Sequence, residues 1–196
     1  MYSVILHCPS LKRDISTLLK ILPESQIYEG LRMTDGLEAS KLAHHAIVQW
    51  AKAHKEPCVW VLEDDCLFTM DFSIVRWLDD ADWAQRHGYD IMVGGSTKTY
   101  DEKQVREGMI EVSAFHSSHC VVYFESGYDK VLKSAAPIDW TPGRDNGARC
   151  VVVWPFVAVQ APSFSGCTGR YENYVPLYQQ HQRHLGLLSL LWKASV

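Results

Sequence analysis

The sequence lacks several features that would place it in a specialised class of protein. No apolar run approaches the roughly 20 residues that a membrane-spanning helix needs, so we expect no membrane span. No internal repeat or low-complexity segment is visible, and no linker divides the chain. The first residues, MYSVILHCPS, lack the basic segment and cleavage pattern of a signal peptide, and we therefore expect a cytoplasmic protein.

The chain also has no excess of positive charge and no cysteine pair of the CxxC type. Its 19 Lys and Arg against 23 Asp and Glu give a net charge of −4, which argues against a broad, sequence-independent grip on nucleic acid. Six scattered cysteines in a cytoplasmic protein are more typical of buried free thiols than of a zinc site. With 47% hydrophobic and 21% charged residues over 196 positions, the composition is that of one ordinary globular domain.

Short apolar runs alternate with stretches of helical periodicity along the whole chain. This alternation predicts an α/β fold, with a mostly parallel central sheet covered by helices on both faces. In such a sheet the ligand crevice lies beyond the carboxyl ends of the strands. The predicted strands are 2–6, 26–31, 58–62, 89–93, 120–124 and 151–159; the predicted helices are 10–22, 37–54, 72–83, 127–135 and 185–192.

Two finer predictions concern the helix at 37–54 and the polar segment 96–111. In the helix, the spacing of Leu42, Ala46 and Trp50 predicts that these three side chains form its apolar stripe. The polar segment is predicted to be a mobile loop or hairpin. The Gly94-Gly95 pair before it would serve as a hinge or allow the backbone to approach a ligand.

Three consecutive acids, Glu63, Asp64 and Asp65, follow the apolar run 58–62 directly. They should therefore stand at the end of a buried strand, where a ligand crevice is expected, and their mutual repulsion calls for a positive partner. Carboxylate oxygens select hard cations such as Mg²⁺, Ca²⁺ or Mn²⁺. Strand alternation would turn Glu63 and Asp65 to one face and Asp64 to the other. The alternative is a solvated strand end that merely carries acids.

The segment VLEDDCLF resembles the acidic motif of glycosyltransferase family 25, the lipooligosaccharide-biosynthesis type. Three further segments are similar to the family's motifs in the same order: the helix that starts at Asp35-Gly36, the stretch 119–140 that ends in PIDW, and WPFVAVQAPSFSGCTGR at 154–170. The chain departs from the family in two places. Gly166 follows Ser165 where relatives carry an aspartate, and His44-His45 stands where they carry Ser-His.

The resemblance implies a single domain of the GT-A type over residues 1–196, with a nucleotide-sugar and metal half at 1–93 and an acceptor half with a C-terminal tail at 94–196. It implies transfer of a sugar from a nucleotide-sugar, a UDP-sugar first of all, to a hydroxyl group with inversion. The cofactor would be Mn²⁺ or Mg²⁺. Asp65 would be its direct ligand, and Glu63 or Asp64 would act directly or through water.

The same resemblance points to the residues around the reaction. Asp139, in the segment Pro137-Ile138-Asp139, is the candidate general base, and Asp145 in the glycine-flanked GRDNG loop is the second candidate. Either aspartate could instead cap a helix or turn. Lys98 and Arg170 could equally be solvated surface residues. The residues expected to contact the donor are Leu6, His7, Asp35, Lys98, Ser165 and Arg170.

The acceptor and two rival functions stay open at the level of the sequence. A surface oligosaccharide is the first choice of acceptor. A hydroxymethylated base in phage DNA is the second, since so compact a chain suggests a viral origin. The DNA acceptor would need a basic groove built from Arg144, Arg149, Arg170 and Lys193. The rivals are a metal-dependent phosphoesterase or nuclease, and a degenerate, non-catalytic module that binds a sugar nucleotide or glycan, which Gly166 would suit.

Overall fold

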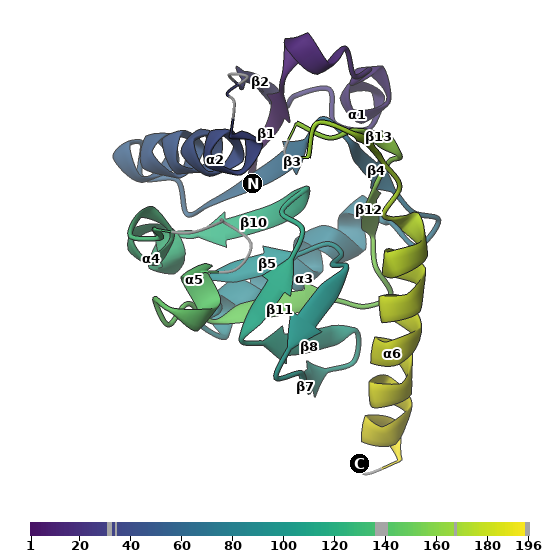
Figure 1. Cartoon of the computed structure of the whole chain (residues 1–196). Coiled ribbons are helices and arrows are strands. Elements are labelled where there is room, and N and C mark those ends of the chain that lie inside the picture. The colour runs from purple at the N-terminus through teal and green to yellow at the C-terminus, as the bar shows by residue number, and fades with distance from the viewer. Residues whose placement is uncertain (31–32, 34, 136–140, 167, 195–196) are drawn as a thin grey trace.

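An eight-stranded sheet forms the centre of the computed structural model, which describes residues 1–30, 33, 35–135, 141–166 and 168–194 (Figure 1). The strand order is β2-β1-β3-β10-β5-β11-β8-β7, so both halves of the chain contribute strands. The strands are β1 (Tyr2–His7), β2 (Gln26–Glu29), β3 (Cys58–Glu63), β5 (Ile91–Val93), β7 (Lys103–Arg106), β8 (Met109–Val112), β10 (Cys120–Phe124) and β11 (Cys150–Val153).

Helices and three small strand pairs surround this sheet. The pairs are β4 (Cys66–Phe68) with β12 (Ala158–Gln160), β6 (Lys98–Tyr100) with β9 (Ala114–His116), and β13 (Ser163–Phe164) with β14 (Tyr171–Glu172). The helices are η1 (Pro9–Leu11), α1 (Ser16–Ile21), α2 (Gly36–Ala53), α3 (Ile74–Arg86), η2 (Glu125–Gly127), α4 (Tyr128–Leu132), α5 (Thr141–Arg144) and α6 (Val175–Lys193). None of the helices in the described ranges is long and apolar enough to cross a membrane.

The sheet is mixed rather than mostly parallel, which corrects part of the predicted fold. β2, β1 and β3 run parallel, as do β5 and β11, but β10 runs antiparallel between β3 and β5. β8 and β7 add two antiparallel strands at the far edge. A parallel neighbour requires a crossover connection, usually a helix, and the segment from β5 to β10 contains only short strands. The chain therefore returns antiparallel there.

Helices cover both faces, as predicted, because the side chains of the central strands alternate between two cores. Along β3, Val59 and Val61 belong to the core beneath α2, α4 and α6, whereas Trp60 and Leu62 belong to the core beneath α1 and α3. All four side chains are almost fully buried. A strand buried on both faces reads as a continuous apolar run, which is why the sequence CVWVL located β3 correctly.

The predicted apolar stripe of α2 is wrong by about one residue. The buried positions are Ala43, His44, Ile47, Val48 and Ala51, whereas Leu42 is 47% exposed. Neighbouring positions differ by 100° around a helix, so a stripe assigned one residue away turns toward solvent. The helix itself agrees with the predicted segment 37–54 to within one residue at each end, since it runs from Gly36 to Ala53.

Other predicted segments are divided in the structure. The helix expected at 10–22 is split into η1 and α1, and the strand expected at 151–159 into β11 and β12, which residues 154–157 separate. The helix expected at 185–192 is longer and runs over the whole of α6. Along it, Tyr178, His181, Leu185 and Ser189 face inward.

The polar segment after β5 is built into the fold, as strands, and is not a free loop. β6 pairs with β9, and β7 pairs with β8. The Thr99 hydroxyl is 2.8 Å from Nε2 of His181, and Gln104 donates to the Ser189 hydroxyl, so α6 holds both strands. Of the two predicted forms, the hairpin is the one that the structure supports.

The Gly94-Gly95 pair lets two backbone segments approach each other closely. A Cβ atom on Gly95 would lie 2.0 Å from the carbonyl oxygen of Ala158, and one on Gly94 would lie 2.7 Å from the Cys120 sulfur. The glycines thus allow the end of β5 to contact β12. The predicted hinge has no support in this packing.

Gly95→Ala should lower the free energy of unfolding by about 1–3 kcal/mol, because the added methyl group overlaps a backbone carbonyl that cannot turn away. Urea denaturation measures this loss. Gly166→Ala is the matched control: its Cβ would lie 3.6 Å from a Leu11 side-chain carbon, an ordinary contact, and its stability should stay within about 0.5 kcal/mol of the wild type. Equal stability of the two variants would contradict the packing role of Gly95.

Candidate functional site

A pocket with about 690 Å³ of empty space, its open mouth included, lies at the carboxyl ends of β1, β2 and β3. Leu6 and Cys8 come from the end of β1, Gly30 follows β2, and the three acids are the last residue of β3 and the two residues after it. From β1 the chain goes to β2 on one side and then, through α2, to β3 on the other side. The pocket therefore stands at a topological switch point, where open α/β sheets bind ligands.

The remaining walls come from α2 and from the segment after β12. Gly36, Ala39, Ser40 and Ala43 lie on the first two turns of α2 and face the pocket. On the opposite wall are Gln160, Ser165 and Gly166. In Figure 1 this segment, which includes β13, passes over the ends of β1 and β3.

Asp64 is the most fully satisfied of the three acids. Its Oδ2 accepts a hydrogen bond from the backbone N–H of Cys8 at 2.8 Å and lies 3.0 Å from Nδ1 of His7. Its Oδ1 accepts from Nη1 of Arg13 at 2.5 Å. The side chain is 3% exposed, so these three partners replace the water that burial removed.

Asp65 is equally buried but poorly compensated. Its Oδ2 is 3.2 Å from Nη1 of Arg13 and 3.5 Å from the Ser163 hydroxyl, and its Oδ1 is buried without a hydrogen-bond partner among the described residues. Burial, together with the negative charges of Glu63 and Asp64, raises the pKa of Asp65 to about 7, although Arg13 opposes the shift. A buried carboxylate with a free oxygen is suited to bind a cation.

Glu63 is held by a network that reaches into the core. Its Oε1 lies 3.1 Å from Nε2 of His44 and accepts a 2.7 Å hydrogen bond from the Ser118 hydroxyl. Nδ1 of His44 is hydrogen-bonded in turn to the Tyr123 hydroxyl at 2.9 Å. Burial alone would raise the pKa of Glu63, but the hydrogen bonds and charge of His44, with the bond from Ser118, outweigh it and lower the pKa to about 2.

The backbone beside this network is strained. Ser117 has a φ of 93°, which is uncommon for a residue with a side chain. It immediately precedes Ser118, which donates to Glu63, and His119, whose Nδ1 is 3.0 Å from the Tyr178 hydroxyl. Such strain persists only where surrounding contacts fix the backbone, and it is concentrated at functional sites.

The three acids are arranged differently from the strand alternation that the sequence predicted. β3 ends at Glu63, and Asp64 and Asp65 lie in the turn before β4, so the period of two no longer applies. As a result Asp64 and Asp65 both meet Arg13, while Glu63 turns to His44.

The acids fit a divalent cation through Asp65 in particular. Among the described residues, no three His, Cys, Asp or Glu side chains are grouped closely enough to form a ready metal cluster. The unpartnered oxygen of Asp65 is nevertheless a hard ligand in the wall of the pocket. Asp64 already has three donors, so it is the less available of the pair.

The other residues predicted to contact the donor are divided between the pocket and its surroundings. Leu6 and Ser165 line the pocket, and His7 borders it through Asp64. Asp35 caps α2, accepting hydrogen bonds from the N–H groups of Leu37 and Glu38, which is a structural role at the helix start.

Two predicted cations and the second candidate base lie outside the pocket lining. Arg170 is exposed in the turn between β13 and β14. Lys98 is exposed on β6, and its ammonium group stands 4.7 Å from the centroid of the Tyr100 ring. Asp145 is exposed after α5, near the amino end of β11 and therefore at the edge of the sheet opposite the pocket. Asp139 lies outside the described residues.

Sequence reasoning missed Arg13 and Ser118. Arg13 stands in the connection between η1 and α1, and Ser118 precedes β10, far from the acids in the chain. A basic residue just beyond the first strand end was the available signal for Arg13, because all parallel strand ends meet at one edge. Nothing in the sequence singles out Ser118 among its neighbours.

Fold, pocket and acids together define an α/β protein with a candidate ligand site at the ends of its parallel strands. No protein-family model matches the sequence, and no curated protein matches it either. The structure is similar to that of A197 from STIV, with a TM-score of 0.56 and 13% identity over 88% of this chain and 95% of that one. This likeness shows the fold alone, and the resemblance to glycosyltransferase family 25 stays a prediction.

Two further solved structures are similar at lower scores. A UDP-glucose pyrophosphorylase in its apo form gives a TM-score of 0.45 and 11% identity over 87% of this chain and 68% of that one. A mannose-1-phosphate geranyltransferase from Thermus thermophilus gives 0.49 and 10%, over 78% and 73%. At these scores the function has to be inferred from the site.

Neutralising Asp65 and Asp64 should change stability in opposite directions in metal-free buffer with EDTA. The folded-state pKa of Asp65 is raised above its ordinary value of 3.8, so its contribution to stability is complete below pH 4 and is lost as pH rises through about 7. Asp65→Asn should therefore be more stable than the wild type at pH 8, by about 1–3 kcal/mol, and similar to it at pH 4.

Asp64→Asn is the matched variant for this experiment. It removes a carboxylate that accepts from Arg13 and the Cys8 N–H, and it should lose about 1–3 kcal/mol at pH 8. Chemical denaturation at the two pH values gives both numbers. Destabilisation of Asp65→Asn at pH 8 would show that Asp65 is adequately compensated without a bound cation.

Proposed function

We propose that this chain is a nucleotide-sugar-dependent glycosyltransferase that uses Mn²⁺ or Mg²⁺. The observation that carries the proposal is the pocket at the switch point, in whose wall a buried carboxylate, Asp65, has one oxygen without a partner among the described residues. A charged, metal-bridged diphosphate is the kind of ligand that such a wall accommodates. The resemblance of VLEDDCLF to the family motif supports the same interpretation.

The pocket has a place for each part of a nucleotide-sugar. Leu6 and Cys8 at the end of β1 offer an apolar surface for the nucleoside. The first two turns of α2 face the pocket with Gly36 and Ser40, and the positive end of a helix dipole favours phosphate. The sugar would then point toward Gln160 and Gly166 on the opposite wall.

Asp65 would hold the divalent ion directly, and Glu63 or Asp64 would support it. When bound, such an ion supplies Lewis-acid stabilisation of the negative charge that develops on the departing nucleoside diphosphate. His44 and Ser118 keep Glu63 ionised and fixed, so the wall of the pocket stays negative and rigid around the ion.

An inverting transfer also requires a base that accepts the proton of the acceptor hydroxyl. Asp139 is the proposed base, on the match of its PID segment to the family motif. Asp145 is less suitable, because it follows α5 at the opposite edge of the sheet.

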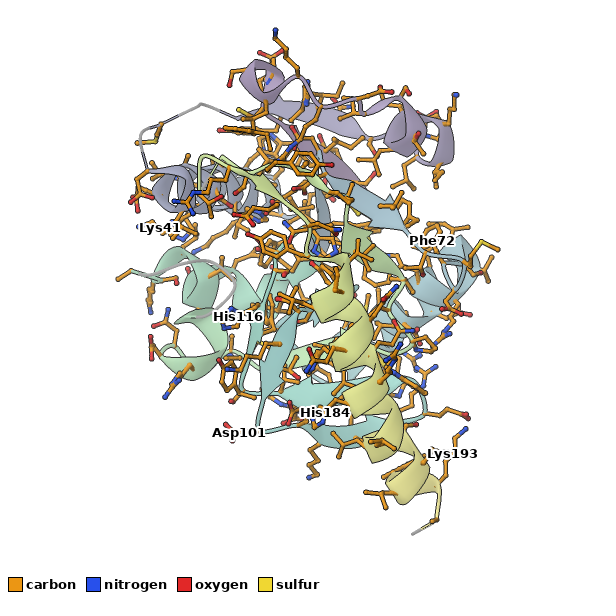
Figure 2. The ribbon with its side chains drawn as sticks, turned by 45° about the vertical axis from the view of Figure 1, so that its right-hand side comes forward. Lys41, Phe72, Asp101, His116, His184 and Lys193 are labelled. Carbon is orange, nitrogen blue, oxygen red and sulfur yellow. The ribbon has the colours of Figure 1, made fainter. Side chains whose placement is uncertain are left out.

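A glycan is the proposed acceptor, with a hydroxymethylated DNA base as the second choice. Two of the basic residues that a DNA groove would need are engaged elsewhere: Arg149 pairs with Glu111, and Lys193 pairs with Glu107. Figure 2 shows Lys193 at the lower end of α6, far from Lys41 on α2, the helix whose first turns line the pocket. These positions do not form one basic surface beside the pocket.

A two-metal phosphoesterase is less compatible with the described carboxylates. The additional acid that the sequence offered for it, Asp90, is 1% exposed, and its Oδ2 accepts from Lys130 at 2.6 Å and from the Arg149 N–H at 2.8 Å. It fastens α4 and β11 to the sheet rather than facing the pocket. A non-catalytic module that binds a sugar nucleotide would have the same donor site as the proposed glycosyltransferase and would differ from it only in having no turnover.

Thermal shift with UDP- and GDP-sugars, with and without Mn²⁺, tests donor binding. One donor should stabilise the wild type by several degrees only when Mn²⁺ is present, since a ligand that binds the native state raises its melting temperature. Asp65→Ala should fold and lose this shift, whereas Asp79→Ala, which removes an exposed acid on α3, should keep it.

Slow Mn²⁺-dependent release of nucleoside diphosphate from that donor distinguishes a transferase from a binding module. Cleavage of nucleic acid instead would favour the phosphoesterase.

Asp139→Asn should reduce turnover by a factor on the order of 10² or more, because the acceptor proton loses its base, while donor affinity stays nearly unchanged. The measurement is kcat with saturating donor beside a donor titration, and Asp145→Asn is the comparison variant with activity near that of the wild type. A large loss of donor affinity with little loss of turnover would place Asp139 in the nucleotide pocket instead.

A further inference from the structure

Arg13 occupies an unusual position among the acids. Its side chain is 13% exposed, and its Nη1 contacts Asp64 Oδ1 at 2.5 Å and Asp65 Oδ2 at 3.2 Å. Its Nη2 donates to the carbonyl oxygen of Phe164 at 2.7 Å. A single guanidinium thus joins the end of β3 to β13, on the opposite side of the pocket.

Within the described residues, Arg13 is the one Lys or Arg that lines the pocket. Burial lowers its pKa, but Asp65, Asp64 and Glu63 outweigh that effect and raise the pKa above its ordinary value, so it stays charged. Arg13 therefore supplies the positive partner that the acids require in the absence of any ion. Lys98 and Arg170, which the sequence suggested as diphosphate partners, do not line the pocket.

The contacts of Arg13 with the two aspartates can be replaced by other partners. Asp64 keeps the Cys8 N–H and His7 as partners if Arg13 leaves, whereas Asp65 would be left with the long Ser163 contact and would need a new cation. Nε of Arg13 is buried with no hydrogen-bond partner in the described part of the chain. A planar guanidinium with a donor to spare is well suited to grip phosphate oxygens.

A divalent ion on Asp65 and the guanidinium of Arg13 compete for the same carboxylate edge. Two cations at that edge repel each other at short range, and burial weakens the screening of that repulsion. The entry of a diphosphate would remove the conflict, because its oxygens can bind both cations at once.

We propose that Arg13 is a diphosphate-binding and positioning residue that exchanges Asp64 and Asp65 for the donor's phosphates when a divalent ion binds at Asp65. The exchange also frees the carbonyl oxygen of Phe164, so the wall formed by β13 responds to the state of the donor site. The proposal rests on the proposed function and adds to it a residue that no motif indicated.

Binding of Mn²⁺ alone, measured by electron paramagnetic resonance, is the first test. Arg13→Ala should bind Mn²⁺ more tightly than the wild type, on the order of tenfold, because the competing charge is gone. Arg13→Lys keeps a charge at this position and should stay close to the wild type. Arg86→Ala is the matched control for loss of one positive charge, since Arg86 is exposed and pairs with Asp82 on α3.

Binding of UDP and GDP at saturating Mn²⁺, measured by calorimetry, is the second test. For the diphosphate that the wild type binds, Arg13→Ala should bind at least about tenfold more weakly, because a charge-assisted contact to the phosphates is lost. Arg13→Lys should lie between the two, since an ammonium cannot make the bidentate contact. Arg86→Ala should match the wild type in both experiments.

An Arg13→Ala variant with a higher affinity for Mn²⁺ and a lower affinity for diphosphate than the wild type supports the proposal. Weaker binding of both, or diphosphate affinity equal to that of the wild type, overturns it and leaves Arg13 as a structural partner of the acids. The melting temperature and circular dichroism of each variant separate loss of fold from loss of binding, and Arg13→Lys provides the answer if Arg13→Ala does not fold. A wild type that binds neither Mn²⁺ nor either diphosphate would contradict the proposed function itself. A wild type that binds them, with an Arg13→Ala variant that binds both more weakly or binds diphosphate equally well, would contradict only the role of Arg13.

Discussion

The crowding of three adjacent carboxylates at the end of β3, with Asp64 and Asp65 buried and Glu63 half-buried, is the constraint on which the site depends. Each ionised group that leaves water must find compensation, and the protein provides it differently for each. Glu63 is compensated from the core by His44 and Ser118, and Asp64 by Arg13 and the end of β1. Asp65 remains incompletely compensated among the described residues, and this deficit is what makes the pocket a candidate for binding cations.

Much of the fold and the place of the site could be predicted from the sequence. The run CVWVL located β3, the periodicity of 37–54 located α2, and the acids at the strand end located the pocket. These signals are local, because a buried strand or helix carries its pattern within its own residues. The predicted donor contacts Leu6 and Ser165 also lie in the lining of the pocket, although their roles stay predictions.

The rest depended on contacts that the sequence does not display. The direction of β10 depends on the absence of a crossover helix from the described segment before it, and the face of α2 depends on which of two neighbouring stripes meets the sheet. Arg13 reaches the acids across the sheet edge, from a segment with no pattern of its own. The partner of the Gly94-Gly95 pair could not be predicted either, because a close approach to backbone and a close approach to ligand require the same residue type.

The described lining of the pocket comes entirely from residues up to Asp65 and from residues after Val159. Five of the eight strands of the sheet lie between these two parts in the sequence. During synthesis the acids are therefore made long before the residues of the opposite wall. Contact between such distant segments requires a large loop to close, which costs conformational entropy. The site is therefore a reporter of complete folding: a chain interrupted before β12 would hold the acids and Arg13 but have no enclosed space in which to use them.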